Sequence, residues 1–211
     1  MTPERATKFR KVAARRQPNL TVILENVHDP HNIGAVLRSC DSVGIGEIFV
    51  LYTDPGLRRE SLQLSKRTSS GARKWVDVHF YTDATACFRQ VRQRYERVWS
   101  THLDETAVGL YELDLSGSVA LLFGNEHEGL SEAALQHADG NFAIPQVGMV
   151  ESLNISVACA VTLYEAFRQR KSQGFYDEKK LLSQQEQQAL FKEYERRHDE
   201  RIDPKSVRRK A

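Results

Sequence analysis

An asparagine and an arginine lie close together in the segment HDPHNIGAVLRSCD, and both side chains could contact a polar or anionic ligand. Asp29, followed by proline, is typical of a helix start, with the aspartate as the N-cap. Asn32 then lies in the first helical turn, near the carboxyl edge of the sheet, where α/β proteins bind ligands. Arg38 has Asp41 three positions away. A ligand contact and a salt bridge to Asp41 are therefore the alternatives for Arg38.

A second segment, LLFGNEHEGLS, is typical of a buried strand, a tight glycine turn and a helix. Glycine lacks a Cβ and can take positive φ, so Gly124 and Gly129 would let a ligand approach backbone amides closely. The segment has no Gly-Lys-Ser/Thr, which excludes a P-loop. Gly44 and Gly46 precede a strand instead of opening a helix, so they are no dinucleotide fingerprint, and a nicotinamide-dependent oxidoreductase is disfavoured.

The third segment, IPQVGMVESLNISVA, runs from a strand through an irregular apolar loop into a helix. Its apolar residues neither alternate nor follow a helical period, and Pro145 and Gly148 bend the chain. These features predict the wall of a pocket. Structural roles are the alternative: Ser152 as an N-cap and Asn154 as a polar residue of the first turn.

Metal and disulfide sites are not expected. His28 and His31 have no third ligand nearby in the sequence. The cysteines Cys40, Cys87 and Cys159 are odd in number, far apart and never in a CxxC pair, which favours a reducing, cytoplasmic setting. No apolar run follows the basic N-terminal residues, and none is long enough to span a bilayer, so we expect neither secretion nor membrane insertion.

Strands and helices alternate along most of the chain. Short apolar runs rich in β-branched residues predict strands at 20–24, 48–51, 75–80, 98–101, 119–123 and 142–144. Helical spacing of apolar residues is visible at 33–40 and 84–95, and most strongly at 152–170. This alternation predicts an α/β fold with a mostly parallel sheet and helices on both faces. After Gly174 a polar, charged helix is expected, and Pro204 should stop it.

Basic charge is concentrated at the two ends of the chain. Residues 1–20 carry six Lys/Arg and one acid, and residues 167–211 carry thirteen Lys/Arg and eight acids, so each end has a net charge of +5. The centre, with eleven bases and nineteen acids, has −8. Basic arms beside an acidic body indicate a polyanionic substrate held by the arms, and solvated terminal helices are the alternative.

The three segments, HNIGAVLRSCDSVG, LLFGNEHEGLS and IPQVGMVESLNISVACAVTLYEA, closely resemble in order and spacing the three motifs of the SpoU-type branch of SPOUT methyltransferases. The resemblance covers about residues 20–170. It implies an α/β fold with a C-terminal trefoil knot, an exception to unknotted topology. It also implies S-adenosyl-L-methionine as the methyl donor and a homodimer with the active site at its interface.

The resemblance implies roles for particular residues. The polar motif positions, expected to be catalytic, are Asn32, Arg38, Glu126, Ser152 and Asn154. The donor pocket is expected to be lined by Thr101, Leu122, Gly124, Gly129, Ile144, Met149 and Leu153. In this class the acceptor is a ribose 2'-oxygen. Because a guanidinium is a poor base, we expect Arg38 to contact the hydroxyl and an adjacent phosphate, which would relay the proton.

The terminal arms narrow the expected substrate to tRNA. A short basic N-terminal helix over 1–19, a methyltransferase domain over 20–172 and a charged C-terminal extension over 173–211 resemble the layout of tRNA guanosine-18 enzymes. The expected RNA contacts are Arg10, Lys11, Arg15, Arg16 and Arg168. The alternatives are 2'-O-methylation of another tRNA or rRNA nucleotide, and a non-catalytic knotted RNA-binding protein.

Overall fold

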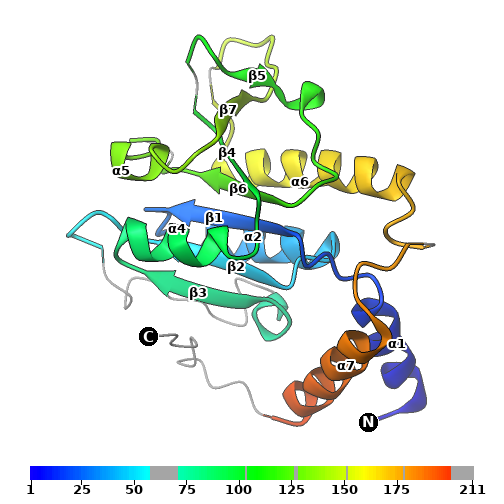
Figure 1. Cartoon of the computed structure of the whole chain (residues 1–211). Coiled ribbons are helices and arrows are strands. Elements are labelled where there is room, and N and C mark those ends of the chain that lie inside the picture. Colours follow the sequence, from blue (N-terminus) through cyan, green and yellow to red (C-terminus); the bar gives the residue numbers. More distant parts are fainter. Residues whose placement is uncertain (58–70, 103, 126–127, 151, 178, 201–211) are drawn as a thin grey trace.

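The computed structural model describes residues 1–57, 71–102, 104–125, 128–150, 152–177 and 179–200. Within these ranges the chain forms one seven-stranded sheet in the order β3-β2-β1-β6-β4-β7-β5 (Figure 1). The strands are β1 (Leu20–Glu25), β2 (Glu47–Leu51), β3 (Asp77–Tyr81), β4 (Arg97–Ser100), β5 (Val108–Gly109), β6 (Val119–Phe123) and β7 (Gly140–Ala143). All neighbouring strands pair in parallel. The prediction of a parallel α/β fold is confirmed.

Helices cover both faces of the sheet, and this explains why its central strands are apolar throughout. Along β1, Val22 and Leu24 face a core shared with α2 (Pro30–Ser42) and α6 (Ile155–Ser172). Ile23 faces the opposite core, shared with α4 (Ala84–Arg92) and α5 (Glu132–Leu135). All three side chains are completely buried. The short 3₁₀ helices η2 (Ala72–Lys74) and η3 (Leu110–Glu112) connect strands.

The terminal helices α1 (Pro3–Ala13) and α7 (Gln184–Asp199) pack side by side, away from the rest of the helices (Figure 1). They share a small core of their own, formed by Phe9, Ala13, Phe191 and Tyr194. The ring of Phe9 lies 5.9 Å from that of Tyr194. The two ends of the described chain therefore form one helical unit.

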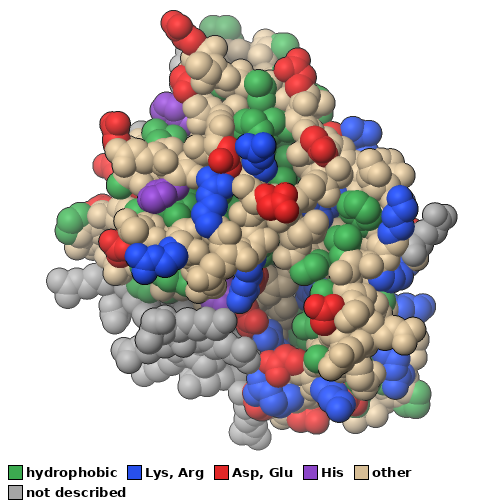
Figure 2. All heavy atoms as spheres, viewed as in Figure 1, with side chains coloured by type: hydrophobic (Ala, Val, Ile, Leu, Met, Phe, Trp, Pro, Cys, Tyr) green, Lys and Arg blue, Asp and Glu red, His purple; other side chains and the backbone are tan. Residues whose placement is uncertain are grey.

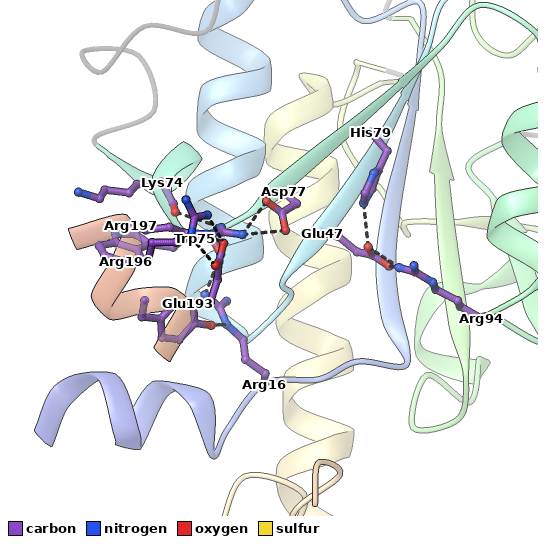
Figure 3. A network of polar contacts seen from close by, with 11 residues as sticks. Arg16, Glu47, Lys74, Trp75, Asp77, His79, Arg94, Glu193, Arg196 and Arg197 are labelled. Carbon is purple, nitrogen blue, oxygen red and sulfur yellow. Dashed lines mark hydrogen bonds and ion pairs between the residues drawn. The ribbon is translucent and has the colours of Figure 1, made fainter. Parts of the chain in front are cut away.

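Two arginines attach this unit to the sheet domain (Figure 3). The side chain of Arg16 is only 3% exposed. It donates hydrogen bonds to the hydroxyl of Tyr194 at 2.7 Å, to the carbonyls of Ile45 and Trp75 at 2.7 and 3.1 Å, and to the carboxylate of Asp41 at 2.9 Å. Arg197 on α7 donates to both carboxylate oxygens of Asp77, at 2.9 and 3.0 Å, and to the carbonyl of Lys74.

Most predicted boundaries agree with the structure, and the differences have local causes. The strand predicted from Trp75 begins at Asp77, because the chain first makes the η2 turn. The two-residue β5 was not predicted, being too short for a pattern. The helix predicted from residue 152 begins at Ile155. The predicted stop at Pro204 lies outside the described residues.

Candidate functional site

A cavity of about 450 Å³ opens at the carboxyl edge of the sheet. Its walls come from the segments that follow β4, β6 and β7 and from the start of α6. Five of the residues predicted to bind the donor line it, namely Thr101, Gly124, Gly129, Ile144 and Leu153. The predicted catalytic residue Ser152 lines it as well. Three segments far apart in sequence thus meet at one site.

Two residues predicted for the pocket do not line this cavity. Leu122 is completely buried within the core beneath α4, because it faces that side of β6. Its carbonyl accepts a hydrogen bond from the backbone N–H of Thr101 at 3.0 Å. The side chain of Met149 is fully exposed, since the loop that carries it extends away from the core. Neither residue is among those that line this cavity, and their roles in binding the donor stay predictions.

The glycine turn after β6 forms one wall of the cavity. Asn125 and Gly129 exchange two backbone hydrogen bonds, of 3.0 and 2.9 Å, which close the turn. A Cβ at position 124 would lie 2.4 Å from the carbonyl carbon and oxygen of Gly129, so only glycine fits there. Gly129 has a φ of 72°, in the left-handed region, which glycine adopts without strain because it has no Cβ. Glu126, predicted to be catalytic, lies outside the described residues.

The first and third motifs meet through two asparagines. Asp29 caps α2 as predicted, accepting a hydrogen bond from the N–H of His31 at 2.8 Å. The side-chain amide of Asn154 donates to the side-chain oxygen of Asn32 at 3.1 Å. The other side-chain atom of Asn154, Oδ1, accepts from the N–H of Ser156 at 3.0 Å and so caps α6. The alternative role of Ser152 as the N-cap is therefore wrong.

Arg38 lies on α2, about two turns after Asn32, and its side chain is exposed. The alternative salt bridge to Asp41 does not form, because Asp41 accepts from Arg16 instead. Arg38 makes no hydrogen bond or ion pair with another residue in the described part of the chain. Its guanidinium is thus available to a ligand.

Hydrogen bonds order the segment that follows β4 beside His102, another residue that lines the cavity. The hydroxyl of Ser100 donates to the side-chain oxygen of Asn141. The amide of Asn141 donates to the carboxylate of Asp104 at 2.5 Å, and the Thr106 hydroxyl donates to the same carboxylate at 2.7 Å. The hydrogen bond from Thr106 is the main cause that lowers the pKa of Asp104.

A junction of three loops beneath the glycine turn was not predicted. It is centred on Glu25, which is completely buried, and on Asn26, which has a φ of 54°. The side chain of Asn26 accepts from the N–H of Thr53 at 2.9 Å, and its carbonyl accepts from the side-chain amide of Asn125 at 3.0 Å. The carboxylate of Glu25 accepts from both Thr53 and Ser131. A charged residue at the end of the apolar run LTVILE was the signal available in the sequence.

The residues predicted to contact RNA fall into two groups. Arg10 and Lys11 on α1, Arg15 just after it and Arg168 on α6 are exposed. Arg15 pairs with Asp177 at 3.1 Å and Arg168 with Glu165 at 2.8 Å, while Arg10 lies over the ring of Phe191. Arg16 contradicts its prediction, because its side chain is buried and its donors are used inside the protein.

Acidic neighbours also limit the basic surface of α7. Figure 2 shows basic and acidic side chains next to one another over this helix. Arg196 pairs with Glu193 at 2.6 Å and also with Glu200. Hydrogen bonds from Arg196, the main cause, and from Arg197 lower the pKa of Glu193 to about 2. The basic charge available for a polyanion therefore lies more on α1 than on α7.

Two features of the described residues concern other kinds of site. No helix among them is long and apolar enough to cross a membrane. Within the same ranges, no group of three or more His, Cys, Asp or Glu side chains is arranged to hold a metal ion.

Comparisons with known proteins point to one family. The sequence profile of the SpoU rRNA Methylase family matches residues 19–164. The tRNA (guanosine(18)-2'-O)-methyltransferase of Thermus thermophilus is 44% identical over 180 residues, which cover 85% of this chain and 90% of that protein. The crystal structure of the Aquifex aeolicus TrmH/SpoU tRNA modifying enzyme has a TM-score of 0.82 at 30% identity, covering 94% of this chain and 98% of the other.

A third comparison involves a bound ligand. The SpoU methyltransferase AviRb from Streptomyces viridochromogenes, in complex with the cofactor AdoMet, has a TM-score of 0.63 at 28% identity and covers 74% of this chain and 62% of the other. Because the profile matches most of the chain and the Thermus thermophilus relative is 44% identical over 85% of it, the chain belongs to the SpoU rRNA Methylase family.

Proposed function

We propose that this protein transfers a methyl group from S-adenosyl-L-methionine to a ribose 2'-oxygen of tRNA, at guanosine-18 of the D-loop. One observation carries the proposal above all. The second and third motif segments line a single cavity, and Asn32 of the first segment accepts a hydrogen bond from Asn154 of the third, in a chain that shares 44% identity with a tRNA (guanosine(18)-2'-O)-methyltransferase over 85% of its length. The enzyme class is then an RNA 2'-O-methyltransferase.

The cavity is suited to the methyl donor. Its volume of about 450 Å³ lies within the range of small-molecule sites, roughly 300–1,000 Å³. The side chains of Leu130, Phe142, Leu153 and Ile155 supply apolar contacts for an adenosyl group. The turn at Gly124 and Gly129 brings backbone groups to the surface of the cavity for polar contacts. Bound there, the donor supplies an electrophilic methyl group on a sulfonium.

The protein's own side chains act on the ribose. Arg38 contacts the 2'-hydroxyl and a neighbouring phosphate and stabilises the negative charge that develops on the oxygen. Because a guanidinium stays protonated at neutral pH, the phosphate relays the departing proton. Asn32, held by Asn154 at 3.1 Å, orients the site together with Glu126 and Ser152. Holding two reacting atoms in line can lower an activation barrier by roughly 7–11 kcal/mol.

We also propose a homodimer and a C-terminal trefoil knot. Large apolar side chains are exposed on the loop before α6, at Val147, Met149 and Val150, and on α6 itself, at Val157 and Tyr164. Exposed apolar patches of this kind mark protein interfaces, and a two-fold interface would cover the same patch on both subunits. The active site then lies at this interface.

The exposed basic residues Arg10, Lys11, Arg15 and Arg168 bind the phosphates of tRNA. Arg16 is not among them, since it is buried. The three cysteines are buried and form no disulfide, which is consistent with an enzyme that acts on tRNA in the reducing cytoplasm.

A second candidate is methylation of an rRNA ribose, which the description of the matching family favours. The test is to incubate the protein with transcripts of tRNA and of rRNA and with labelled S-adenosyl-L-methionine, then digest the RNA and identify modified nucleosides by mass spectrometry. A 2'-O-methylated guanosine in the tRNA D-loop is the expected product. Labelling of rRNA alone would overturn the tRNA assignment, and no labelling of either RNA would favour a non-catalytic RNA-binding protein.

A further inference from the structure

Glu25 ends the central strand β1 and is completely buried, although it lies outside the lining of the cavity. Its carboxylate accepts hydrogen bonds from the Thr53 hydroxyl at 2.7 Å, from the Ser131 N–H at 2.9 Å and from the Ser131 hydroxyl at 2.5 Å. Thr53 and Ser131 follow β2 and β6, the two strands on either side of β1. All three donors are neutral, so the buried carboxyl group is satisfied by hydrogen bonds from two loops.

Ser131 connects this carboxylate to the cavity. It directly follows Leu130 and Gly129, which both line the wall of the cavity. Its N–H and its hydroxyl both donate to Glu25, so the chain immediately after the glycine turn is fixed at two atoms. The hydroxyl oxygen of Ser131 also accepts from the N–H of Ala134 at 3.2 Å and caps α5.

The other end of the turn is held by Asn26, the residue that follows β1. The side-chain amide of Asn125 donates to the carbonyl of Asn26 at 3.0 Å. The glycine turn is therefore attached to the end of β1 both where it begins and where it ends. Its position relative to Phe142 and Ile155, which also line the cavity, depends on these two attachments.

We infer that Glu25 is a positioning residue that holds the glycine turn in the shape required to bind the methyl donor. It acts through Ser131 and Leu130 and does not touch the donor. Because this wall of the cavity is already ordered in the free protein, it loses little conformational entropy when the donor binds. The inference rests on the proposed function, which supplies the ligand of the cavity.

The test compares Glu25→Gln and Ser131→Ala with the matched control Ser183→Ala. Ser183 caps α7 as Ser131 caps α5, with its hydroxyl accepting from the N–H of Glu186 at 3.3 Å, but it has no contact with Glu25. Dissociation constants for S-adenosyl-L-methionine are measured by calorimetry, and KM values for donor and tRNA by steady-state kinetics. Thermal unfolding is followed for all variants.

Glutamine has one acceptor oxygen and cannot accept from all three donors. We expect Glu25→Gln and Ser131→Ala each to raise the dissociation constant and the KM for the donor about tenfold, the effect of leaving one buried polar group without its hydrogen bond. The KM for tRNA should stay within about twofold, because the exposed arginines that bind RNA are untouched. Ser183→Ala should leave both constants within about twofold.

Each outcome bears on a different claim. If the wild-type protein does not bind S-adenosyl-L-methionine, the proposed function fails and this inference fails with it. If the wild-type protein binds the donor, and the folded variants bind it equally well, only the positioning role is overturned. Equal losses for donor and tRNA would indicate a general structural role and would also overturn it. Should Glu25→Gln not fold, Ser131→Ala decides the question alone.

Discussion

Replacement of Arg16 by alanine should unfold the protein at a markedly lower temperature. Three of its four acceptors are neutral groups inside the protein, the hydroxyl of Tyr194 and the carbonyls of Ile45 and Trp75. Losing a buried hydrogen bond costs about 1 kcal/mol or more, so these three together give about 3–5 kcal/mol. The ion pair with Asp41 adds little, because that carboxylate is 35% exposed and screened by water.

For a chain of this size, 1 kcal/mol corresponds to a shift in Tm of about 2–4 °C. Arg16→Ala should therefore lower the Tm by about 10 °C, as measured by scanning calorimetry. Arg10→Ala is the control. The guanidinium of this exposed arginine lies over the ring of Phe191, 4.6 Å from its centroid, and this contact should contribute less than about 1 kcal/mol to the stability of the protein. Arg16→Ala melting within about 2 °C of the wild type would refute the assignment of Arg16 as a structural anchor.

Four other predictions follow from the site and the surface. Arg38→Ala should abolish methyl transfer and leave donor binding by calorimetry nearly unchanged; near-normal turnover would contradict the role given to Arg38. Sedimentation equilibrium should show a homodimer, and an active monomer at micromolar concentration would exclude an interfacial active site. Neutralising Arg10, Lys11 and Arg15 should reduce the slope of log K for tRNA against log salt by about 2–3, and equal slopes would show that α1 makes no phosphate contacts. Burial alone raises the pKa of Glu47, but hydrogen bonds from its basic neighbours outweigh this and lower it to about 2. The stabilising effect of the ionised Glu47 is then fully present above about pH 4.5 and is lost as the pH falls toward 2. The free energy of unfolding in urea should therefore become nearly equal for Glu47→Gln and the wild type in acid. A difference between the two proteins that does not change with pH would argue against the lowered pKa.

The strands of the sheet could be predicted because each is encoded by a short run of consecutive residues. Runs such as LTVILE and VALLF are apolar at successive positions, as strands buried on both faces must be, and they lie where strands form. The cap at Asp29 was also predictable, since an aspartate before a proline suits the start of a helix in any context. The two-residue strand β5 left no such pattern.

The site residues were harder, because their roles depend on contacts between distant segments. Ser152 and Asn154 are both good N-caps, and the choice between them coincides with a hydrogen bond from Asn154 to Asn32, far away in the sequence. Arg16 looked like one more base of a charged arm, and its partner Tyr194 lies near the other end of the chain. Counting charges cannot separate a buried arginine from an exposed one.

The pairing of α1 with α7 has a consequence for how the chain is made. Phe191, with which Phe9 shares a core, is added to the growing chain 182 residues after Phe9. At 5–20 residues per second, roughly 10–40 s pass before its partner is synthesised. During that interval the sheet domain can form and Trp75 can contact Phe9, but the part of α1 that packs on Phe191 and Tyr194 stays uncovered and open to chaperones. The helix α1 is therefore made long before α7 but reaches its final place only after α7 has been made.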